Sequence, residues 1–172
     1  MAQFFSIHPV QPQPRLIKQA AEIARAGGLL AIPTDSAYAL AGHIGDASLL
    51  DRIRRIRGVD NRHHFTLMCR DLSEIATYAR VDNGQYRLLK ATTPGSYTFI
   101  LEGTKELPRR ILHPKRKTIG LRVPAHPLPL ALLEALNEPM LTSTLMLPGD
   151  DLPLNDPEEI RDRLEKRIDL VI

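Results

Sequence analysis

A chain of 172 residues is long enough to build one domain around its own hydrophobic core, and we expect a single domain over residues 1–172. Its composition, 43% hydrophobic and 25% charged, excludes a disordered or low-complexity protein. No apolar run approaches the ~18 residues of a membrane span, and no basic start precedes an apolar stretch, so we expect neither a membrane protein nor a secreted one. The single cysteine, Cys69, excludes a disulfide framework and a Cys-based zinc site, and it favours a cytoplasmic location.

The net charge of +3 is modest, but the cations are unevenly distributed. Thirteen of the 23 lysines and arginines fall in two basic windows, residues 52–70 and 105–122, which hold one acid each. Residues 150–172 reverse the sign, with eight acids against four bases. If the two basic windows meet in the fold, they form a surface that attracts the phosphates of a nucleotide or a nucleic acid; the alternative is a solvated basic face.

Hydrophobic periodicity and capping residues predict alternating strands and helices in the first half of the chain. Pro14 suits a first helical turn, Asp46 and Asp71 suit N-caps, and Gly27 and Gly58 suit left-handed helix ends. The expected elements are a strand over 3–7, a helix over 14–26, a strand over 29–32, a helix from 46 to 57, a strand over 65–69, and helices over 71–78 and 82–91.

In the second half, a Thr93-Pro94-Gly95 turn precedes a strand rich in β-branched and aromatic residues, and Asp156-Pro157 opens the most clearly marked helix. The expected elements are strands over 96–102 and 118–123, a helix over 126–137, a strand over 140–144, a helix from 156 to 167, and an extended run over 169–172. Strands that alternate with helices predict one α/β domain with a largely parallel or mixed sheet.

Several familiar motifs are absent, among them the phosphate loop, the dinucleotide-binding glycine turn, the nucleophile elbow and the zinc-binding H-E-x-x-H helix. We predict no metal site at the adjacent His63 and His64, because neighbouring side chains point apart on regular backbone and no carboxylate cluster accompanies them. Cys69 lies on an apolar strand and is expected to be an inert core residue.

The segment after the strand at residues 29–32 is a better candidate for function. It carries the small polar residues Thr34, Asp35 and Ser36, followed by Tyr38, beyond the end of a predicted strand, where open α/β sheets bind their ligands. The alternative is a simple turn in which Asp35 and Ser36 cap the next helix.

Five motifs, in this order, resemble the YrdC/YciO family of threonylcarbamoyl-adenylate synthases. They are PTDSAYAL at 33–40, RIR at 55–57, TPGSYTF at 93–99, GLRVPAHP at 120–127 and PMLTST at 139–144. The resemblance covers about residues 3 to 172, and it is closest to the YciO branch. It implies a twisted α/β sheet around a positively charged cavity. It also implies condensation of L-threonine, bicarbonate and ATP into threonylcarbamoyl-AMP and pyrophosphate, toward the t6A modification of tRNA. ATP would react as its Mg²⁺ complex.

The resemblance also assigns roles to particular residues. Thr34, Tyr38 and Thr142 would line the amino-acid pocket, and Arg122 would pair with the substrate carboxylate through its planar guanidinium. Thr98 and Thr144 would lie beside the nucleotide. The catalytic pair would be Arg55 and Arg57, which hold the triphosphate and stabilise the charge of the departing pyrophosphate.

Helix geometry tests the arginine pair. Residues two apart on a helix point about 200° apart, so Arg55 and Arg57 share a cavity only if the helix ends near Ile56. Gly58 favours such an ending. The alternative role for both arginines is compensation of the helix dipole in a last turn.

The chain departs from the synthases at several positions. Met146 stands where they carry an asparagine, and a thioether cannot donate the hydrogen bonds of an amide. Arg55 stands where the synthases carry a lysine, and His63 and His64 occupy a stretch where the synthases usually have other residues. Leu152 and Leu154 replace small hydroxyl residues. Family members continue past the position of Ile172 with a strand that bears ligand contacts. These differences predict a weak or altered activity.

Two functions follow from the sequence. The first is a nucleotide-binding protein with synthase activity. The second is a non-catalytic module that binds tRNA, rRNA or double-stranded RNA through the basic windows; because aromatic residues are few and tryptophan is absent, backbone contacts are favoured over base stacking.

Overall fold

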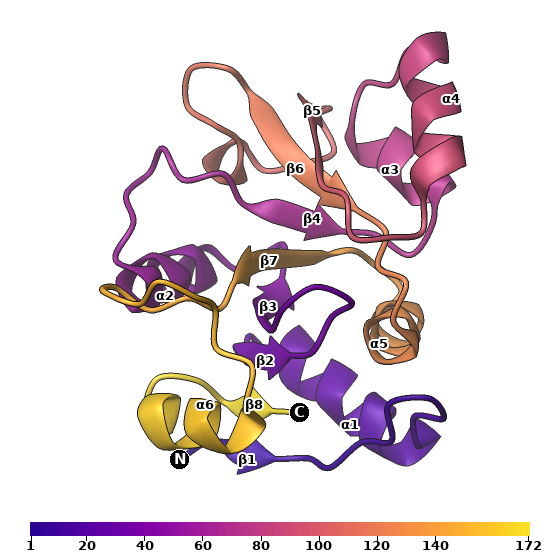
Figure 1. Ribbon diagram of the computed structural model, residues 1–172. Helices are drawn as coiled ribbons and strands as arrows, with labels where there is room; N and C mark the ends of the chain where they lie inside the picture. Colours follow the sequence, from indigo (N-terminus) through magenta and orange to yellow (C-terminus); the bar gives the residue numbers. More distant parts are fainter.

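The computed structural model describes residues 1–172 and centres on one mixed sheet of eight strands (Figure 1). The strands are β1 (Gln3–Phe4), β2 (Leu30–Ile32), β3 (Ala39–His43), β4 (Thr66–Met68), β5 (Phe99–Glu102), β6 (Thr118–Arg122), β7 (Met140–Thr144) and β8 (Leu170–Val171). Across the sheet their order is β1-β8-β2-β3-β7-β4-β6-β5. The pairs β1–β8, β2–β8 and β4–β6 are parallel and the others antiparallel, which confirms the predicted α/β class with a mixed sheet.

The predicted helices are present, with ends that shift by a few residues. They are α1 (Pro14–Arg25), α2 (Ala47–Arg57), α3 (Leu72–Tyr78), α4 (Asn83–Thr92), α5 (Pro127–Leu136) and α6 (Pro157–Leu164), with a short 3₁₀ helix at Arg109–Ile111. Asp46, Asp71, Asp82 and Asp156 each accept a hydrogen bond from a backbone N–H of the first turn. Gly58 ends α2 with a φ of 66°, in the left-handed region that favours glycine.

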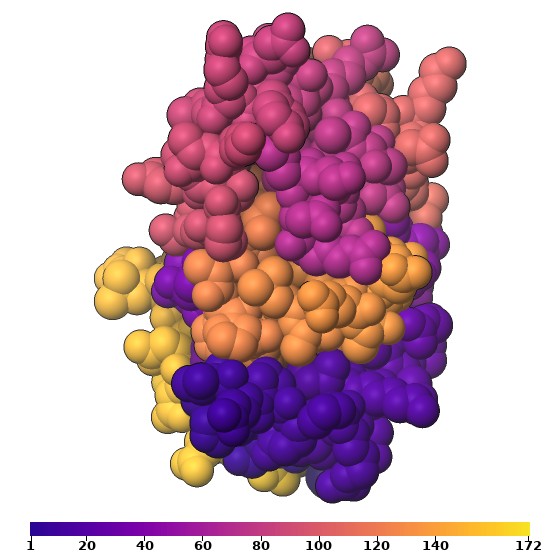
Figure 2. Space-filling view, turned by 90° about the vertical axis from the view of Figure 1, so that its right-hand side faces the viewer, coloured from indigo at the N-terminus to yellow at the C-terminus, as the bar shows by residue number.

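Helices cover both faces of the sheet, and each face has its own hydrophobic core. On one side, α1 and α5 pack over strand residues such as Ala41 and Met140, and we call this the α5 face. On the other, α2 and α6 pack over Leu40, Leu141 and Val171, and we call this the α2 face. Figure 2 shows the helices of the α5 side, with α5 as an orange band between the α3–α4 region above and the indigo α1 region below.

Strand β3 is the element that the sequence pattern misses. Residues 39–43 are two alanines, a leucine, a glycine and a histidine, with no β-branched side chain to mark a strand. The structure explains the small residues, because a Cβ at Gly42 would come within 2.2 Å of Leu49 on α2. β3 is a central strand pressed between helices on both faces, and this burial, which the pattern does not record, selects small side chains.

Candidate functional site

Arg122, the last residue of β6, ties together three loops. Its guanidinium pairs with the Asp35 carboxylate, donates to Ser36 Oγ at 2.9 Å and donates from Nε to the Gly95 carbonyl at 3.3 Å. The Asp35 carboxylate also accepts the Ala125 N–H at 3.1 Å. Only 9% of the Arg122 side chain is exposed, and this burial lowers its pKa. Asp35 and Ser36 therefore do not cap a helix, because the chain continues into β3 and both residues bind Arg122.

Thr34 belongs to the same loop, and its hydroxyl is engaged within its own turn. Thr34 Oγ1 donates to the Ala37 carbonyl at 2.6 Å and accepts the N–H groups of Ser36 and Ala37. Its oxygen also lies 3.2 Å from Ser36 Oγ, which receives the Arg122 contact. The structure thus brings two predicted substrate residues, Thr34 and Arg122, together through Ser36.

A row of threonines lies on the α5 face of the sheet. Thr142 lies in register with Thr66, Thr66 with Gly120, and Thr142 Oγ1 donates to the Thr66 carbonyl at 2.8 Å. A Cβ at Gly120 would come within 3.0 Å of Thr98 Cγ2, so glycine lets the Thr98 side chain lie directly on β6. Thr142 is buried, whereas Thr98 and Thr144 are exposed. The predicted nucleotide and substrate threonines therefore share one face of the sheet.

Arg57 lies on the opposite, α2 face. It donates from Nη1 to the buried Ser143 Oγ at 2.9 Å, and His63 Nε2 lies 3.0 Å from the same oxygen. Burial, followed by the positive charge of Arg57, lowers the pKa of His63 to about 4. The ring is then neutral at pH 7. Its Nε2 can accept a hydrogen bond from the Ser143 hydroxyl, while Ser143 Oγ accepts one from Arg57.

Arg55 does not join this cluster. Helix α2 runs through Arg57 rather than ending near Ile56, so Arg55 points to another side and is exposed. Its neighbour Arg54, three residues before Arg57, shares the Arg57 side and lies over the Phe65 ring at 5.5 Å. Arg54 also pairs with Asp51 at 3.8 Å. The i, i+3 spacing of Arg54 and Arg57 is the sequence signal that would have identified this second arginine.

The Nε atoms of Arg54 and Arg57 are both buried without a hydrogen-bond partner. An unpartnered buried donor on a cation is costly unless an acceptor reaches it. Burial also lowers the pKa of Arg57. These two guanidiniums, the predicted Arg57 and the unpredicted Arg54 at the C-terminal end of α2, form a candidate anion-binding feature.

The two basic windows meet in the fold, which is the condition for a shared phosphate-attracting surface. The His64 ring stacks on the His113 ring with centroids 4.8 Å apart, and His64 Nε2 lies 3.0 Å from Thr118 Oγ1. Lys115, Arg116 and Arg62 are close enough to His113 to help lower its pKa, although burial is the larger cause. His63 and His64 point apart, to Ser143 and to Thr118, as predicted for neighbours on regular backbone.

The Tyr38 side chain, on the same loop as Asp35 and Ser36, has partners other than Arg122. Its hydroxyl donates to the Ile172 carbonyl at 2.8 Å, and the ring lines a mostly apolar cavity of about 250 Å³ with Pro33 and His126. Burial, followed by the charge of Asp156, raises the Tyr38 pKa. A second cavity, of about 530 Å³, lies beside β5 and is lined by none of the predicted site residues.

Other expectations from the sequence concern metals and membranes. Cys69 is fully buried in the core, as predicted, and burial raises its pKa. No group of three or more His, Cys, Asp or Glu side chains is arranged to hold a metal ion. None of the helices has the length and hydrophobicity required to cross a bilayer.

Comparisons with known proteins show the family to which the chain belongs. The Sua5/YciO/YrdC family model, described as "Telomere recombination", matches residues 22–172. The protein YciO of Escherichia coli K12 is 62% identical over 172 residues, which cover all of this chain and 84% of that protein. The crystal structure of E. coli YciO has the same fold with a TM-score of 0.97, over all of this chain and 84% of that one.

More distant relatives include enzymes. A threonylcarbamoyl-AMP synthase of Halorhodospira halophila is 27% identical over 165 residues, 95% of this chain and 85% of that protein. The structure of P. abyssi Sua5 complexed with L-threonine shares the fold, with a TM-score of 0.86 at 23% identity, over 98% of this chain and 50% of that one. The family resemblance read from the five motifs is confirmed: the chain belongs to the Sua5/YciO/YrdC family, in which it is similar to YciO and more distantly related to threonylcarbamoyl-AMP synthases.

Proposed function

We propose that the chain is a cytoplasmic nucleotide-binding protein that makes threonylcarbamoyl-AMP, at a reduced or altered rate, from L-threonine, bicarbonate and ATP. The threonine amine and bicarbonate would condense to a carbamate, with a C–N bond formed, a C–O bond broken and water released. A carbamate oxygen would then attack the α-phosphorus of ATP while the bond to the pyrophosphate group breaks. The departing pyrophosphate carries away the negative charge, so the protein has to stabilise anions rather than supply a covalent group.

The observation that carries this proposal is the half-buried Arg57 guanidinium, which has no acidic partner and uses one terminal nitrogen on Ser143. With Arg54 on the same side of α2, its remaining terminal N–H groups would supply the charge-assisted hydrogen bonds that a triphosphate accepts. His63 is neutral at pH 7, so it does not repel the Arg57 guanidinium, and it fixes the Ser143 hydroxyl that Arg57 contacts. Arg57 is therefore held in place before any ligand arrives.

The amino acid would bind on the other side of β7, near Arg122 and the threonine row. Thr142 and Thr144 point to one face of this strand and Ser143 to the other. A ligand that contacts both the threonine row and Arg57 would therefore have to pass around the Thr144 end of β7. Thr144 is exposed there and Met146 follows it. Because Met146 offers no hydrogen-bond donor where the synthases have an amide, we expect a slower reaction rather than a new one.

The test is an assay of the purified protein with ATP, Mg²⁺, bicarbonate and radiolabelled L-threonine, which follows pyrophosphate and the labelled adenylate. Arg57→Ala should abolish product and weaken ATP binding, and Arg57→Lys should restore part of the binding. Arg87→Ala, an exposed arginine on α4, is the matched control and should behave as the unmodified protein. If ATP does not bind at millimolar concentration, or if Arg57→Ala and Arg87→Ala behave alike, the proposal is wrong.

The union of the two basic windows favours a second function, the binding of tRNA, rRNA or double-stranded RNA. His64 and His113 stack where the windows meet, and the charges of Arg62, Lys115 and Arg116 help to lower the pKa of His113. Phosphate contacts of this kind make affinity fall steeply with salt. Lys115→Ala and Arg116→Ala should each weaken binding of a short RNA duplex and lower its salt dependence, while ATP binding stays unchanged. RNA binding that is insensitive to salt would exclude this role.

A further inference from the structure

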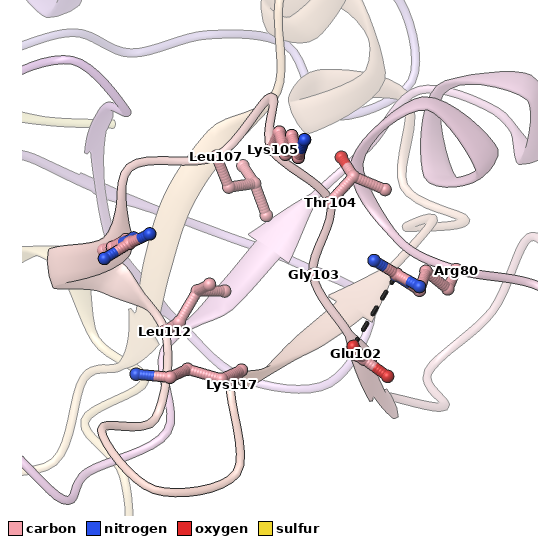
Figure 3. A pocket seen from close by; sticks show the side chains of 9 residues that line it. Arg80, Glu102, Gly103, Thr104, Lys105, Leu107, Leu112 and Lys117 are labelled. Atoms are coloured by element: carbon pink, nitrogen blue, oxygen red, sulfur yellow. Dashed lines mark ion pairs between the residues drawn. The ribbon is translucent and has the colours of Figure 1, made fainter.

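A cavity of about 530 Å³ lies beside the Glu102 end of β5 and the Thr118 end of β6, and none of the residues of the proposed synthase site lines it (Figure 3). Four cations line it, from three separate segments of the chain: Arg80 follows α3, Lys105 and Arg109 follow β5, and Lys117 precedes β6. The one acid in the lining, Glu102, is 3.6 Å from Arg80 in an ion pair. The cavity therefore carries a net positive charge.

Three of these cations have no acidic partner. Lys105 and Arg109 form no ion pair, and the Lys117 ammonium donates only to the Pro114 carbonyl, at 3.1 Å. Glu106 is next to Lys105 in sequence but does not line the cavity. Like charges gathered around one hollow repel each other, and an anionic ligand would relieve that repulsion.

The backbone of Lys117 supplies an independent observation. Its φ is 57°, in the left-handed region, where a residue with a side chain is uncommon and strained. Asn137, the other such residue apart from glycines, ends helix α5, where asparagine is a common choice. Lys117 ends no helix, and glycine would fit its turn with less strain, so the lysine at this position carries a conformational cost.

The floor of the cavity is apolar. Leu107 and Leu112 lie between Lys105 and Lys117 in Figure 3, and Leu107 is buried. Gly103 brings the backbone close, because a Cβ there would come within 2.6 Å of Leu112. A bare inorganic anion would leave this apolar surface unused, whereas a ligand with a ring or alkyl portion would cover it.

We propose that this cavity is a second binding site, for an organic phosphate of about the size of a nucleotide, with the phosphate among Lys105, Arg109 and Lys117 and the apolar portion on the two leucines. The site is separate from the Arg57 cluster and does not depend on the proposed function. A cavity of this volume lies within the range typical of small-molecule sites.

The experiment is an NMR titration of the full chain with AMP, adenosine and inorganic phosphate, in an Arg57→Ala background that removes the first nucleotide site. AMP should shift the Gly103 and Thr104 amide signals, and adenosine and phosphate should each bind at least about tenfold more weakly. Lys117→Gly should weaken AMP about tenfold without lowering the melting temperature, because glycine relieves the strain at this φ. Lys90→Ala, on α4 and outside the cavity, is the charge-matched control.

Three results would overturn the proposal. The first is the absence of AMP-dependent shifts at millimolar concentration, and the second is an equal affinity for adenosine, which would show that the cations contribute nothing. The third is a short RNA duplex that shifts these signals while AMP does not, which would make the cavity part of the RNA surface. These outcomes test the second site even if ATP does not bind at Arg57, because the titration is made with the Arg57→Ala variant.

Discussion

Replacement of His63 tests the electrostatics of the Arg57 cluster. Burial and the nearby arginines lower its pKa from 6.5 to about 4, so between these pH values the unfolded chain binds a proton that the folded chain does not. The free energy of unfolding should therefore be fully maintained above about pH 6.5 and should fall as the pH drops toward 4. His63→Gln keeps a hydrogen-bonding group for Ser143 but cannot titrate, and it should lose this part of the pH dependence.

The magnitude follows from the two pKa values. A fully buried histidine with this shift would cost the folded state about 2.5 kcal/mol between about pH 7.5 and about pH 4.5. His63 is only half-buried, and solvent screening reduces the expected loss to about 1–2 kcal/mol. The steepest change should lie near pH 5, midway between the folded and unfolded values.

The assay is urea denaturation at a series of pH values for the unmodified protein and for His63→Gln. The difference between their free energies of unfolding should change by about 1–2 kcal/mol across the window. Arg87→Gln, at an exposed position on α4, is the control, and its free energy of unfolding should vary with pH as that of the unmodified protein does. Curves for His63→Gln that run parallel to the unmodified protein would refute the assignment of a neutral, desolvated His63.

Three further changes test the packing of the fold. Asp35→Ala leaves the nearly buried Arg122 without its carboxylate and should destabilise the chain by about 2–3 kcal/mol in thermal melts; a loss below about 0.5 kcal/mol would mean that the pair is not formed. Gly120→Ala places a methyl group against two threonines and should cost about 1–3 kcal/mol, whereas Gly84→Ala on α4 has room and should be neutral or stabilising, so equal effects would contradict the packing. Asp82→Ala removes the capping box of α4 and should cost about 1 kcal/mol, as measured by urea denaturation, and an unchanged midpoint would count against that cap.

Most of the fold could be predicted because helix caps and strand patterns depend on residues that are close together in the sequence. Asp46 and Gly58 mark the ends of α2 through hydrogen bonds and backbone conformation within a few residues. Strand β7, at Met140–Thr144, has the bounds that its pattern predicts. Strand β3 was missed because its small residues are determined by the helices packed on it and not by a strand pattern in its own sequence. Leu49 on α2, for example, requires glycine at position 42.

The candidate site was predictable in its residue types but not in its pairings. The motifs singled out Thr34 and Arg122, and the structure connects them through Ser36, across a separation of 86 positions from Ser36 to Arg122. No periodicity in the sequence reports such a contact. The same holds for Ser143, which receives Arg57 and His63 from the other face of the strand that carries the predicted threonines.

The contacts of Arg122 limit how it can bind a substrate carboxylate. A guanidinium has five N–H donors, and the contacts to Asp35, Ser36 and Gly95 use three of them. Two donors remain, one on each terminal nitrogen, which is the number that a bidentate carboxylate requires. However, the positive charge is already neutralised by Asp35 in a nearly buried site, so a second carboxylate would gain less Coulomb energy than it would from a free arginine. Arg122 thus acts first as the residue that holds the three loops together, and under the proposed function an amino acid would have to be bound largely through the hydroxyl groups around Arg122.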